Sequence, residues 1–383
     1  MLWRDVRGEI IRDNEHPFEG FMRIADGEGD LLGEMLCGGS VRSLELDSPT
    51  EIEAAAGAHG APADSLRSAF RGVLSFYRAS ETELLPVNIA HIEDYLRGVV
   101  PAEIGAFAPT EALKAQAIAS RSEAIYKLLA GSRHGDPRYD FVSTQQDQVY
   151  RGAGEEAPAS DREVAATRGL VMTSGGAVID AVYSHSCGGA TASNEDLWPR
   201  GQPLPYLRSR IDRSCGGAPE LGDFASVDDW LDSSPEVFCN PAQSEFPLYA
   251  KGYFRWSRVR KGDEIEAEAR ERGLAIGPLR YLRVKERAPS GRVVRLELQG
   301  EKAVIEIANG DTIQGLLGLP STLFTMGVSV KDGRVEAAAF RGAGYGHGVG
   351  MCQMGAFMMA RRKFNCDDIL GHYFAGVRIE SLY

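Results

Sequence analysis

One carboxylate and two cations stand out because their types and spacing could support acid–base chemistry. Glu103 lies among apolar residues, and Lys114 and Arg121 follow in a stretch rich in alanine and aliphatic residues. On an ideal helix the two cations would project about 20° from each other. Because an unpaired buried charge is costly, they need an anion nearby, and Glu103 is the obvious candidate. The alternative to a catalytic acid is a structural ion pair that ties a loop to a helix.

The surroundings of Glu103 act on its protonation in opposite directions. Apolar neighbours favour the neutral form of a carboxyl group, which suits a general acid, whereas nearby cations favour the carboxylate. Ordinary glycoside hydrolysis also needs a second carboxylate. Glu195 and Asp196 fall in a turn-like stretch, so the sequence offers no convincing second acid. A lone acid fits a reaction in which the substrate supplies its own nucleophile.

A long helix must carry the two cations. Pro109 and Glu111 suit the first turn of a helix, where N–H groups are unpaired and the dipole is positive. From 112 to 129, alanines and aliphatic residues fall on nearly every side, which predicts a buried helix. Before this helix we predict a short helix over 89–97, and then a short apolar loop that carries Glu103.

The rest of the chain predicts small sheets and short helices. A β-rich stretch covers 1–84, with short helices over 51–59 and 63–70. Glycines 175–176 would close a hairpin within 170–183, and glycines 188–189 would let a ligand approach the backbone closely. We further expect helices over 163–167, 230–238, 263–272, 311–316, 351–362 and 367–373, and strands over 281–287, 293–299, 303–307, 324–330 and 334–340.

The composition is that of an acidic, soluble globular protein. The 383 residues carry a formal net charge of −12, with a hydrophobic fraction of 43% and a charged fraction of 25%. This charge argues against nucleic acid as a partner, because nucleic-acid binding relies on cations that replace counterions. No run reaches the roughly 18–20 apolar residues that span a bilayer, and the first residues lack the apolar segment of a signal peptide.

Three blocks of sequence, in the right order, resemble the SpoIID/LytB domain family. The blocks are Val99–Glu103 with Glu111–Ala117 and Arg121, then Gly188–Thr191 with Glu195–Trp198, and finally Gly344–Ala356. Three ordered blocks are a far more specific signal than any one of them alone. The resemblance covers 85–214 and 328–383, and it says little about 1–84 or 221–327.

The resemblance implies an α+β fold. We expect a mixed SpoIID-like core built by 85–220 and 328–383, a β-rich accessory unit over 1–84, and an inserted α/β subdomain over 221–327. Glu103, the Gly188–Gly189 turn and the turn around His347 should converge on one groove.

The activity that the resemblance implies is that of a peptidoglycan lytic transglycosylase. Glu103 would act as general acid and base in cleaving the bond between N-acetylmuramic acid and N-acetylglucosamine, and the sugar's 6-hydroxyl would close a 1,6-anhydro ring. Lys114 and Arg121 would then contact substrate or stabilise charge rather than hold Glu103 ionised. Five further residues match family positions that could line a glycan groove: Thr191, Tyr206, Ser209, His347 and Gln353. For His347, an equal alternative is a histidine that hydrogen-bonds its own loop.

A different class of function also fits the resemblance. LytB-type relatives imply a non-catalytic wall-binding module that stimulates a separate amidase. In either case glycan strands of peptidoglycan are the expected partner, a cell-wall amidase is a further one, and nucleic acid is not expected. The place of action would be extracytoplasmic, in the periplasm or cell wall, with the signal or anchor absent from this chain.

The six cysteines leave metal and disulfide chemistry open, although we expect no cofactor. His185, Cys187, Cys215 and Cys239 include the ligand types of a tetrahedral zinc site, but their spacing is loose. A disulfide that involves Cys187 or Cys215 is the other use in an extracytoplasmic protein. Cys352 stands where the family often has serine, and it lacks the histidine–acid partnership of a thiol nucleophile.

The family sometimes binds zinc through cysteine and histidine in the segment that corresponds to 139–150. This sequence has Val142, Gln146 and Asp147 at those places, so that metal site is not expected.

Overall fold

The structure, a computed structural model, describes most of the chain after residue 66 and isolated strands before it. The described residues are 2–4, 10–12, 21–26, 31–36, 45–47, 50–55, 66–78, 84–131, 134–199, 201–242 and 251–383, with backbone alone before Phe70. Helices mix with strands in several small sheets, which confirms the predicted α+β class. Among these residues, no helix is long and apolar enough to cross a lipid bilayer.

The chain divides into two compact units. Unit 1 contains 1–107 and 124–169, and unit 2 contains 108–123 and 170–383. The long helix α2 (Thr110–Ala130) confirms the predicted helix and contributes residues to both units. The domain boundaries expected from the sequence stay a prediction.

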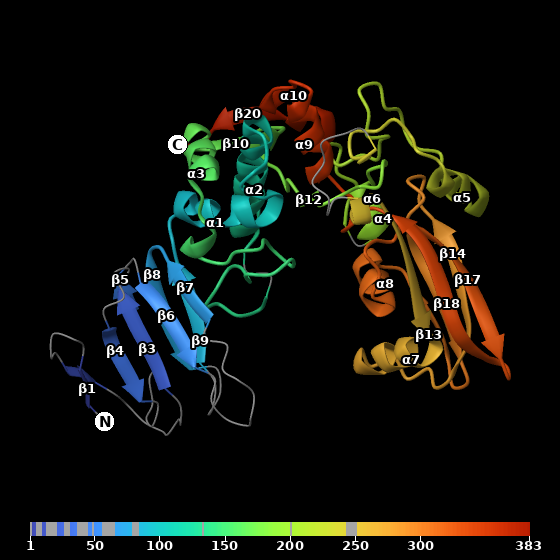
Figure 1. The fold of residues 1–383 in the computed structure, drawn as a ribbon, viewed down its shortest axis with the longest axis horizontal. Coiled ribbons are helices and arrows are strands. Elements are labelled where there is room, and N and C mark those ends of the chain that lie inside the picture. Colours follow the sequence, from blue (N-terminus) through green and yellow to red (C-terminus); the bar gives the residue numbers. More distant parts are fainter. Residues whose placement is uncertain are drawn as a thin grey trace. The chain divides into compact units, whose positions relative to one another are not determined.

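Unit 1 begins with small antiparallel sheets (Figure 1). The strand orders are β4-β3-β6-β7 (Leu31–Leu36, Phe21–Asp26, Thr50–Ala55, Leu66–Phe70), β5-β8-β9 (Glu45–Asp47, Val73–Arg78, Leu84–Ile89) and β1-β2 (Leu2–Arg4, Ile10–Arg12).

The helices predicted over 51–59 and 63–70 are wrong where they are described, because 51–55 and 66–70 lie in β6 and β7. β6 pairs with β3 and β7, and such pairing overrides local propensity. Residues 56–65 lie outside the described residues.

Three helical segments complete unit 1: α1 (Ile92–Ile104), η1 (Ala153–Glu155) and α3 (Pro158–Ala166). The loop predicted around Glu103 is wrong, because α1 continues through Pro101 to Ile104. Proline removes one backbone hydrogen bond from a helix interior, but Leu96, Val99 and Val100 have no exposed surface and hold the helix in the core. Gly105, with a φ of 84°, ends α1 and donates its N–H to the carbonyl of Pro101.

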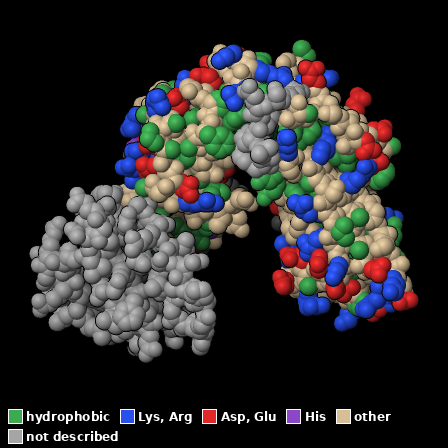
Figure 2. Space-filling view, viewed as in Figure 1, with side chains coloured by type: hydrophobic (Ala, Val, Ile, Leu, Met, Phe, Trp, Pro, Cys, Tyr) green, Lys and Arg blue, Asp and Glu red, His purple; other side chains and the backbone are tan. Residues whose placement is uncertain are grey.

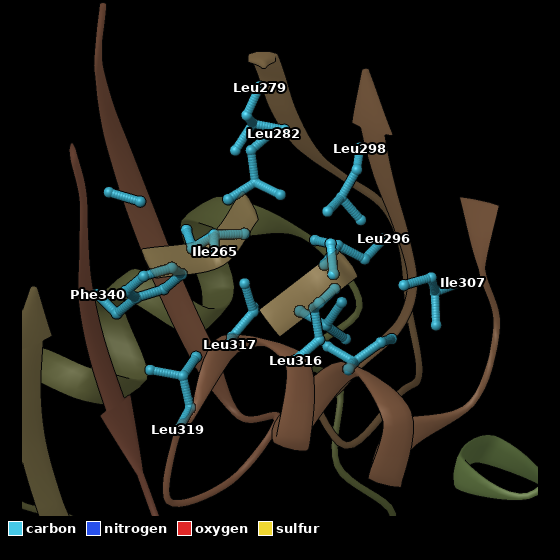
Figure 3. Close-up of a cluster of buried hydrophobic side chains, with 14 of the residues drawn as sticks. Ile265, Leu279, Leu282, Leu296, Leu298, Ile307, Leu316, Leu317, Leu319 and Phe340 are labelled. Atoms are coloured by element: carbon cyan, nitrogen blue, oxygen red, sulfur yellow. The ribbon is translucent and has the colours of Figure 1, made fainter. Parts of the chain in front are cut away.

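Unit 2 contains two larger sheets that enclose its main core. Their orders are β13-β18-β17 (Arg255–Lys261, Arg334–Ala343, Phe324–Lys331) and β14-β15-β16 (Leu279–Arg287, Val293–Gly300, Val304–Ile307). Helices α7 (Gly262–Glu271) and α8 (Gly310–Leu317) pack into the same core, where Leu279, Leu296 and Leu316 point toward one another (Figure 3). These elements confirm the predicted meander and hairpin. The helix expected over 230–238 is wrong in position: α5 (Phe224–Asp232) begins earlier, because Asp223 caps it.

A short parallel pairing joins two of the sequence blocks inside unit 2. β12 (Tyr183–Ser184) runs beside β19 (Met351–Cys352), which leads into α9 (Gln353–Arg361) and α10 (Cys366–Tyr373). Two bridges, Ser186 with Tyr345 and Ala192 with Val349, extend this contact. The second and third blocks therefore lie side by side.

The remaining elements of unit 2 are short. The predicted hairpin is present as β10 (Leu170–Ser174) and β11 (Ala177–Val178), with β20 (Arg378–Ser381) on the other edge of β10 and two short helices elsewhere, α4 (Asn194–Leu197) and α6 (Lys251–Phe254). Gly175 and Gly176 have φ values of 61° and 82°, as this tight turn requires. On the face drawn in Figure 2, acidic and basic side chains of unit 2 are interspersed. Ion pairs of this unit include those of Arg295 with Glu286 and Glu306.

Candidate functional site

Glu103 is a half-buried carboxylate in the last turn of α1. Its Oε1 accepts the backbone N–H of Val149 at 2.8 Å. A backbone donor is fixed in space, so this hydrogen bond sets the orientation of the carboxylate while the side chain keeps exposed surface. The carboxylate is therefore oriented, and the residue keeps part of its surface exposed.

Close packing brings the segment of Val149 against α1. A Cβ at Gly98 would lie 2.7 Å from the ring of Tyr150 and 2.8 Å from the carbonyl of Gly152. Tyr150 also donates its hydroxyl to Asn88 and lies 5.0 Å from the ring of Tyr95, and burial raises the pKa of Tyr150 to about 12. Gly98 therefore allows the contact that supplies the N–H to Glu103.

Asp147 anchors the same segment in unit 1. Its buried carboxylate contacts Nζ of Lys127 at 3.3 Å and Nε2 of His134 at 2.7 Å, and it accepts the N–H of Val142. Burial by itself raises the pKa of Asp147, but the hydrogen bonds from Val142 and His134 and the charge of Lys127 lower it overall. In the segment where the family sometimes binds zinc, an ion-pair network therefore holds the chain.

Lys114 has an anionic partner on its own helix. Its Nζ donates to Oε1 of Glu111 at 2.7 Å, and its side chain is 30% exposed. Glu111 also accepts the N–H of Cys366 at the start of α10. Burial raises the pKa of Glu111, but the hydrogen bonds from Lys114 and Cys366 outweigh this effect and lower it. Glu111 is thus one anionic partner of Lys114, and the expectation that Glu103 serves as the anion for the two cations stays a prediction.

Arg121 differs from Lys114 because it has no exposed surface. Its Nη1 donates to the carbonyl of Leu170, at the start of β10, at 3.1 Å. Ser122 makes a second link to the same strand by accepting the N–H of Met172. A ligand could contact Arg121 only after the structure opened, so this side chain fastens α2 to β10.

His347 uses both ring nitrogens to hold its own surroundings. Nε2 lies 2.8 Å from the carbonyl of Tyr183, and Nδ1 accepts the N–H of Val349. This assigns the proton to Nε2, which donates to Tyr183. The ring of Trp198 lies 5.2 Å away, and its indole N–H donates to Asp311. Half-buried, this pair could still offer an aromatic face to a sugar.

Gln353 belongs to a buried chain of hydrogen bonds within unit 2. It donates to Gln116 on α2, Gln116 donates to Ser120, and Ser120 donates to the hydroxyl of Tyr183. Gln353 is 2% exposed and Gln116 has no exposed surface. This network of hydrogen bonds therefore joins helix α2 to Gln353 of the third block and to Tyr183, in the strand β12 that leads to the second block.

The other groove candidates are mostly internal. Thr191 is 2% exposed and accepts the N–H of Arg210, while Tyr206 is 6% exposed and accepts the N–H of Asp180. Ser209 is half-buried, and its N–H donates to Ser193. At Gly188 and Gly189, atoms of Ala343 and Trp230 fill the space beside the backbone, so the ligand approach expected there is wrong.

The zinc candidates separate in the structure. Cys187 and Cys239 lie in a buried cluster together with Cys352 and Asp212, which sequence reasoning did not assign to it. Cys215 is exposed. His185 lies outside this cluster, with its ring 4.5 Å from that of Tyr253, and burial lowers its pKa to about 4 against a hydrogen bond with Gln353.

The five described cysteines are free thiols, and Cys37 lies outside the described residues. The sequence had grouped Cys187 and Cys239 as zinc candidates, but it offered no reason to add Asp212, and Cys352 stood out only as an unusual cysteine. Convergence of Glu103, in unit 1, with the glycine-rich turns, in unit 2, stays a prediction.

Two family models match parts of this chain. A family model described as stage II sporulation protein, SpoIID, matches residues 80–174, which include Glu103, Lys114 and Arg121. A model for a domain of unknown function, DUF8618, matches 192–350.

Three relatives illustrate the similarity over most of the chain. An uncharacterised protein from Brachyspira hyodysenteriae is 29% identical over 313 residues, which cover 81% of this chain and 72% of the relative. Stage II sporulation protein D from Bacillus subtilis is 26% identical over 307 residues, or 76% and 74% of the two chains. An amidase enhancer from the same organism is 25% identical over 305 residues, or 75% of this chain and 40% of the enhancer.

Proposed function

The chain belongs to the SpoIID/LytB domain family, and from this premise we propose that it is a peptidoglycan lytic transglycosylase with Glu103 as its single catalytic acid and base. The observation that carries the proposal is the setting of Glu103. This carboxylate lies inside the region matched by the family model, is half-buried, and is oriented by the N–H of Val149. Orientation by a fixed backbone group is what a proton donor needs.

The proposed reaction needs one acid and no water. Glu103 protonates the oxygen between N-acetylmuramic acid and N-acetylglucosamine, and the bond from that oxygen to C1 of the muramic acid breaks. The 6-hydroxyl of the same sugar attacks C1 and closes the 1,6-anhydro ring. The carboxylate left on Glu103 accepts the proton of that hydroxyl, which restores the acid.

Three of the proposed substrate contacts keep exposed surface: Lys114, His347 and Ser209. A cation such as Lys114 would bind the lactyl carboxylate or the N-acetyl oxygens of the glycan. Arg121, Thr191, Tyr206 and Gln353 are buried, so in this proposal they position the matched segments rather than touch the sugar.

The test is cleavage of purified glycan strands followed by mass spectrometry. We expect products with 1,6-anhydromuramic ends from the wild-type chain, and a loss of about 10²–10⁴-fold in Glu103→Gln. Glu195→Gln is the matched control, because Glu195 is also half-buried but pairs with Arg208. Equal activity in Glu103→Gln and wild type, at unchanged melting temperature, would refute the catalytic role. A comparable loss in Glu195→Gln would instead indicate a second acid.

A second function is favoured by the relative named amidase enhancer. In that case the chain binds peptidoglycan and stimulates a separate cell-wall amidase without cleaving glycan itself. Retained sedimentation with cell walls, no anhydro product, and faster release of stem peptides by an added purified amidase would support this alternative. Under both proposals the protein acts outside the cytoplasm, where peptidoglycan lies.

A further inference from the structure

Four potential metal ligands meet in the interior of unit 2. They are the thiols of Cys187, Cys239 and Cys352 and the carboxylate of Asp212, all buried, and their ligand atoms lie within 4.8 Å of one another. Sγ of Cys187 is 3.6 Å from Sγ of Cys239 and 3.5 Å from Oδ2 of Asp212. The four residues come from four separate segments of the chain.

We propose that this cluster is a structural Zn²⁺ site with three thiolate ligands and one carboxylate ligand. Zinc–sulfur bonds of about 2.3 Å in a tetrahedron place the sulfurs roughly 3.8 Å apart, close to the spacing present. Thiolate ligands favour zinc over calcium or magnesium, which take oxygen ligands. Four protein ligands fill the tetrahedron, so the ion stabilises the fold and offers no open position to a substrate. This proposal does not depend on the proposed glycan cleavage.

Groups around the cluster already hold the ligands in place. Oδ1 of Asp212 accepts the hydroxyl of Tyr373 at 2.9 Å and lies 3.2 Å from Nε2 of His372, which leaves Oδ2 facing the thiols. Sγ of Cys352 accepts two backbone N–H groups, those of Cys187 and Gly355. Outer hydrogen bonds of this kind orient metal ligands and stabilise thiolates. Cys352 also stands at the start of helix α9, where the positive end of the helix favours a thiolate.

The charges around the cluster also fit a divalent cation. Arg292 has no exposed surface, donates to the carbonyl of Cys187, and has buried Nε and Nη1 atoms with no hydrogen-bond partner among the described residues. Arg255 donates to the carbonyl of Gly188, the neighbour of Cys187, and an arginine side chain is a cation at neutral pH. Three thiolates and a carboxylate are then neutralised by zinc and two arginines.

Glycines of the third sequence block make room for this arrangement. A Cβ at Gly355 would lie 2.0 Å from the hydroxyl oxygen of Tyr373 and 2.8 Å from Oδ2 of Asp212. A Cβ at Gly348 would lie 1.9 Å from Nη2 of Arg292. The glycine-rich block that resembles a ligand loop in sequence therefore packs, in this chain, around a buried polar centre.

The rival arrangement is a disulfide between Cys187 and Cys239. Their sulfurs lie 3.6 Å apart, but a disulfide would use two of the four groups and leave Cys352 and Asp212 buried beside it. Zinc accounts for all four ligands and both cations.

The first experiment measures metal in the full chain purified without a metal-affinity step. We expect about one zinc per chain by mass spectrometry of the elements, and thiols that react with a chromogenic reagent only after zinc is chelated. Replacement of zinc by Co²⁺ should give the sulfur-to-metal charge-transfer and tetrahedral ligand-field absorption of a thiolate site. The cobalt spectrum reads the ligands directly and needs no variant to fold.

Variants then assign the ligands. Cys239→Ser and Asp212→Asn should lose zinc and change the cobalt spectrum, whereas Cys215→Ser, which alters an exposed cysteine outside the cluster, should keep one zinc. The proposal is overturned if the purified chain lacks zinc and peptide mapping finds Cys187 linked to Cys239. It is equally overturned if bound zinc survives both ligand substitutions, or if cobalt shows no thiolate band.

Discussion

Glu103 and the thiol cluster of unit 2 are alike in two respects: each includes a residue at the end of a helix, and each accepts hydrogen bonds from backbone N–H groups. They differ in how much of their surface solvent can reach. Glu103 accepts the N–H of Val149 and keeps exposed surface. In the cluster, Cys187, Cys352 and Asp212 have no exposed surface and Cys239 has 2%. A reactive group must be reached by substrate, whereas a structural centre gains stability from complete enclosure.

This difference explains why resemblance to a family is a poor guide to individual residues. The resemblance assigned His347 and Gln353 of the third block to a glycan groove, and Gly348, Cys352 and Gly355 are their neighbours in the same block. In the structure Gly348, Cys352 and Gly355 line a closed polar centre. Exposure therefore separates the residues that can contact sugar from those that hold the site together.

The largest effect on stability should come from removing the positive charge beside the cluster. In Arg292→Met, the thiolates of the proposed zinc site lose a buried counter-charge, which should cost about 3–5 kcal/mol of unfolding free energy and weaken zinc binding. Urea unfolding and competition with a chelator would measure both. Arg283→Met, at an exposed ion pair with Glu297, is the control and should change little. If Arg292→Met were as mild as this control, the closed centre would hold neutral thiols and no charge balance would be needed.

A smaller effect is expected at the anchor near Glu103. Asp147→Asn weakens the ion pairs with Lys127 and His134, at a cost of about 2 kcal/mol near neutral pH. It should also lower glycan cleavage, since the same segment carries Val149. Asp140→Asn, an exposed neighbour, is the control for both measurements.

The pH dependence of stability tests the same anchor. The pKa of Asp147 is lowered in the folded chain, so its stabilisation is present above the unfolded value of about 3.9 and disappears as pH falls through the lower folded value. Wild-type stability should therefore fall on acidification below about pH 4, and the fall should be shallower in Asp147→Asn. Parallel curves for the two proteins would show that Asp147 is not the group that titrates.

The sequence predicted elements whose pattern is local and missed those set by distant contacts. Helix α2 follows from its alanine-rich run, and the β10–β11 turn follows from Gly175 and Gly176. The continuation of α1 through Pro101 depends on tertiary packing, which outweighs the lost hydrogen bond.

The same limit applies to the sites. Glu103 could be singled out because its neighbours are unusual for an acid, but its donor, Val149, comes from a separate segment. The cluster could not be assembled, because Cys187 and Cys352 are 165 positions apart and Asp212 lies in an irregular loop. The sequence showed only part of it, namely Cys187 and Cys239 among the zinc candidates and an unusual cysteine at 352.

The smallest effect on stability is expected at Lys114, where the comparison between open and enclosed groups becomes sharpest. Lys114 and Arg121 looked equivalent in the sequence, but Lys114 makes a half-exposed ion pair with Glu111 while Arg121 has no exposed surface. Lys114→Met should cost less than about 1 kcal/mol of stability. If Lys114 contacts the glycan, cleavage should nevertheless fall, because a group that acts on the transition state affects rate more than folding.

Arg121→Met is the matched variant, since its loss of activity should follow its loss of fold. Melting temperatures and cleavage rates of both variants would decide the point: an unchanged rate in Lys114→Met removes it from the substrate site, and a large stability loss there would make it a structural residue like Arg121.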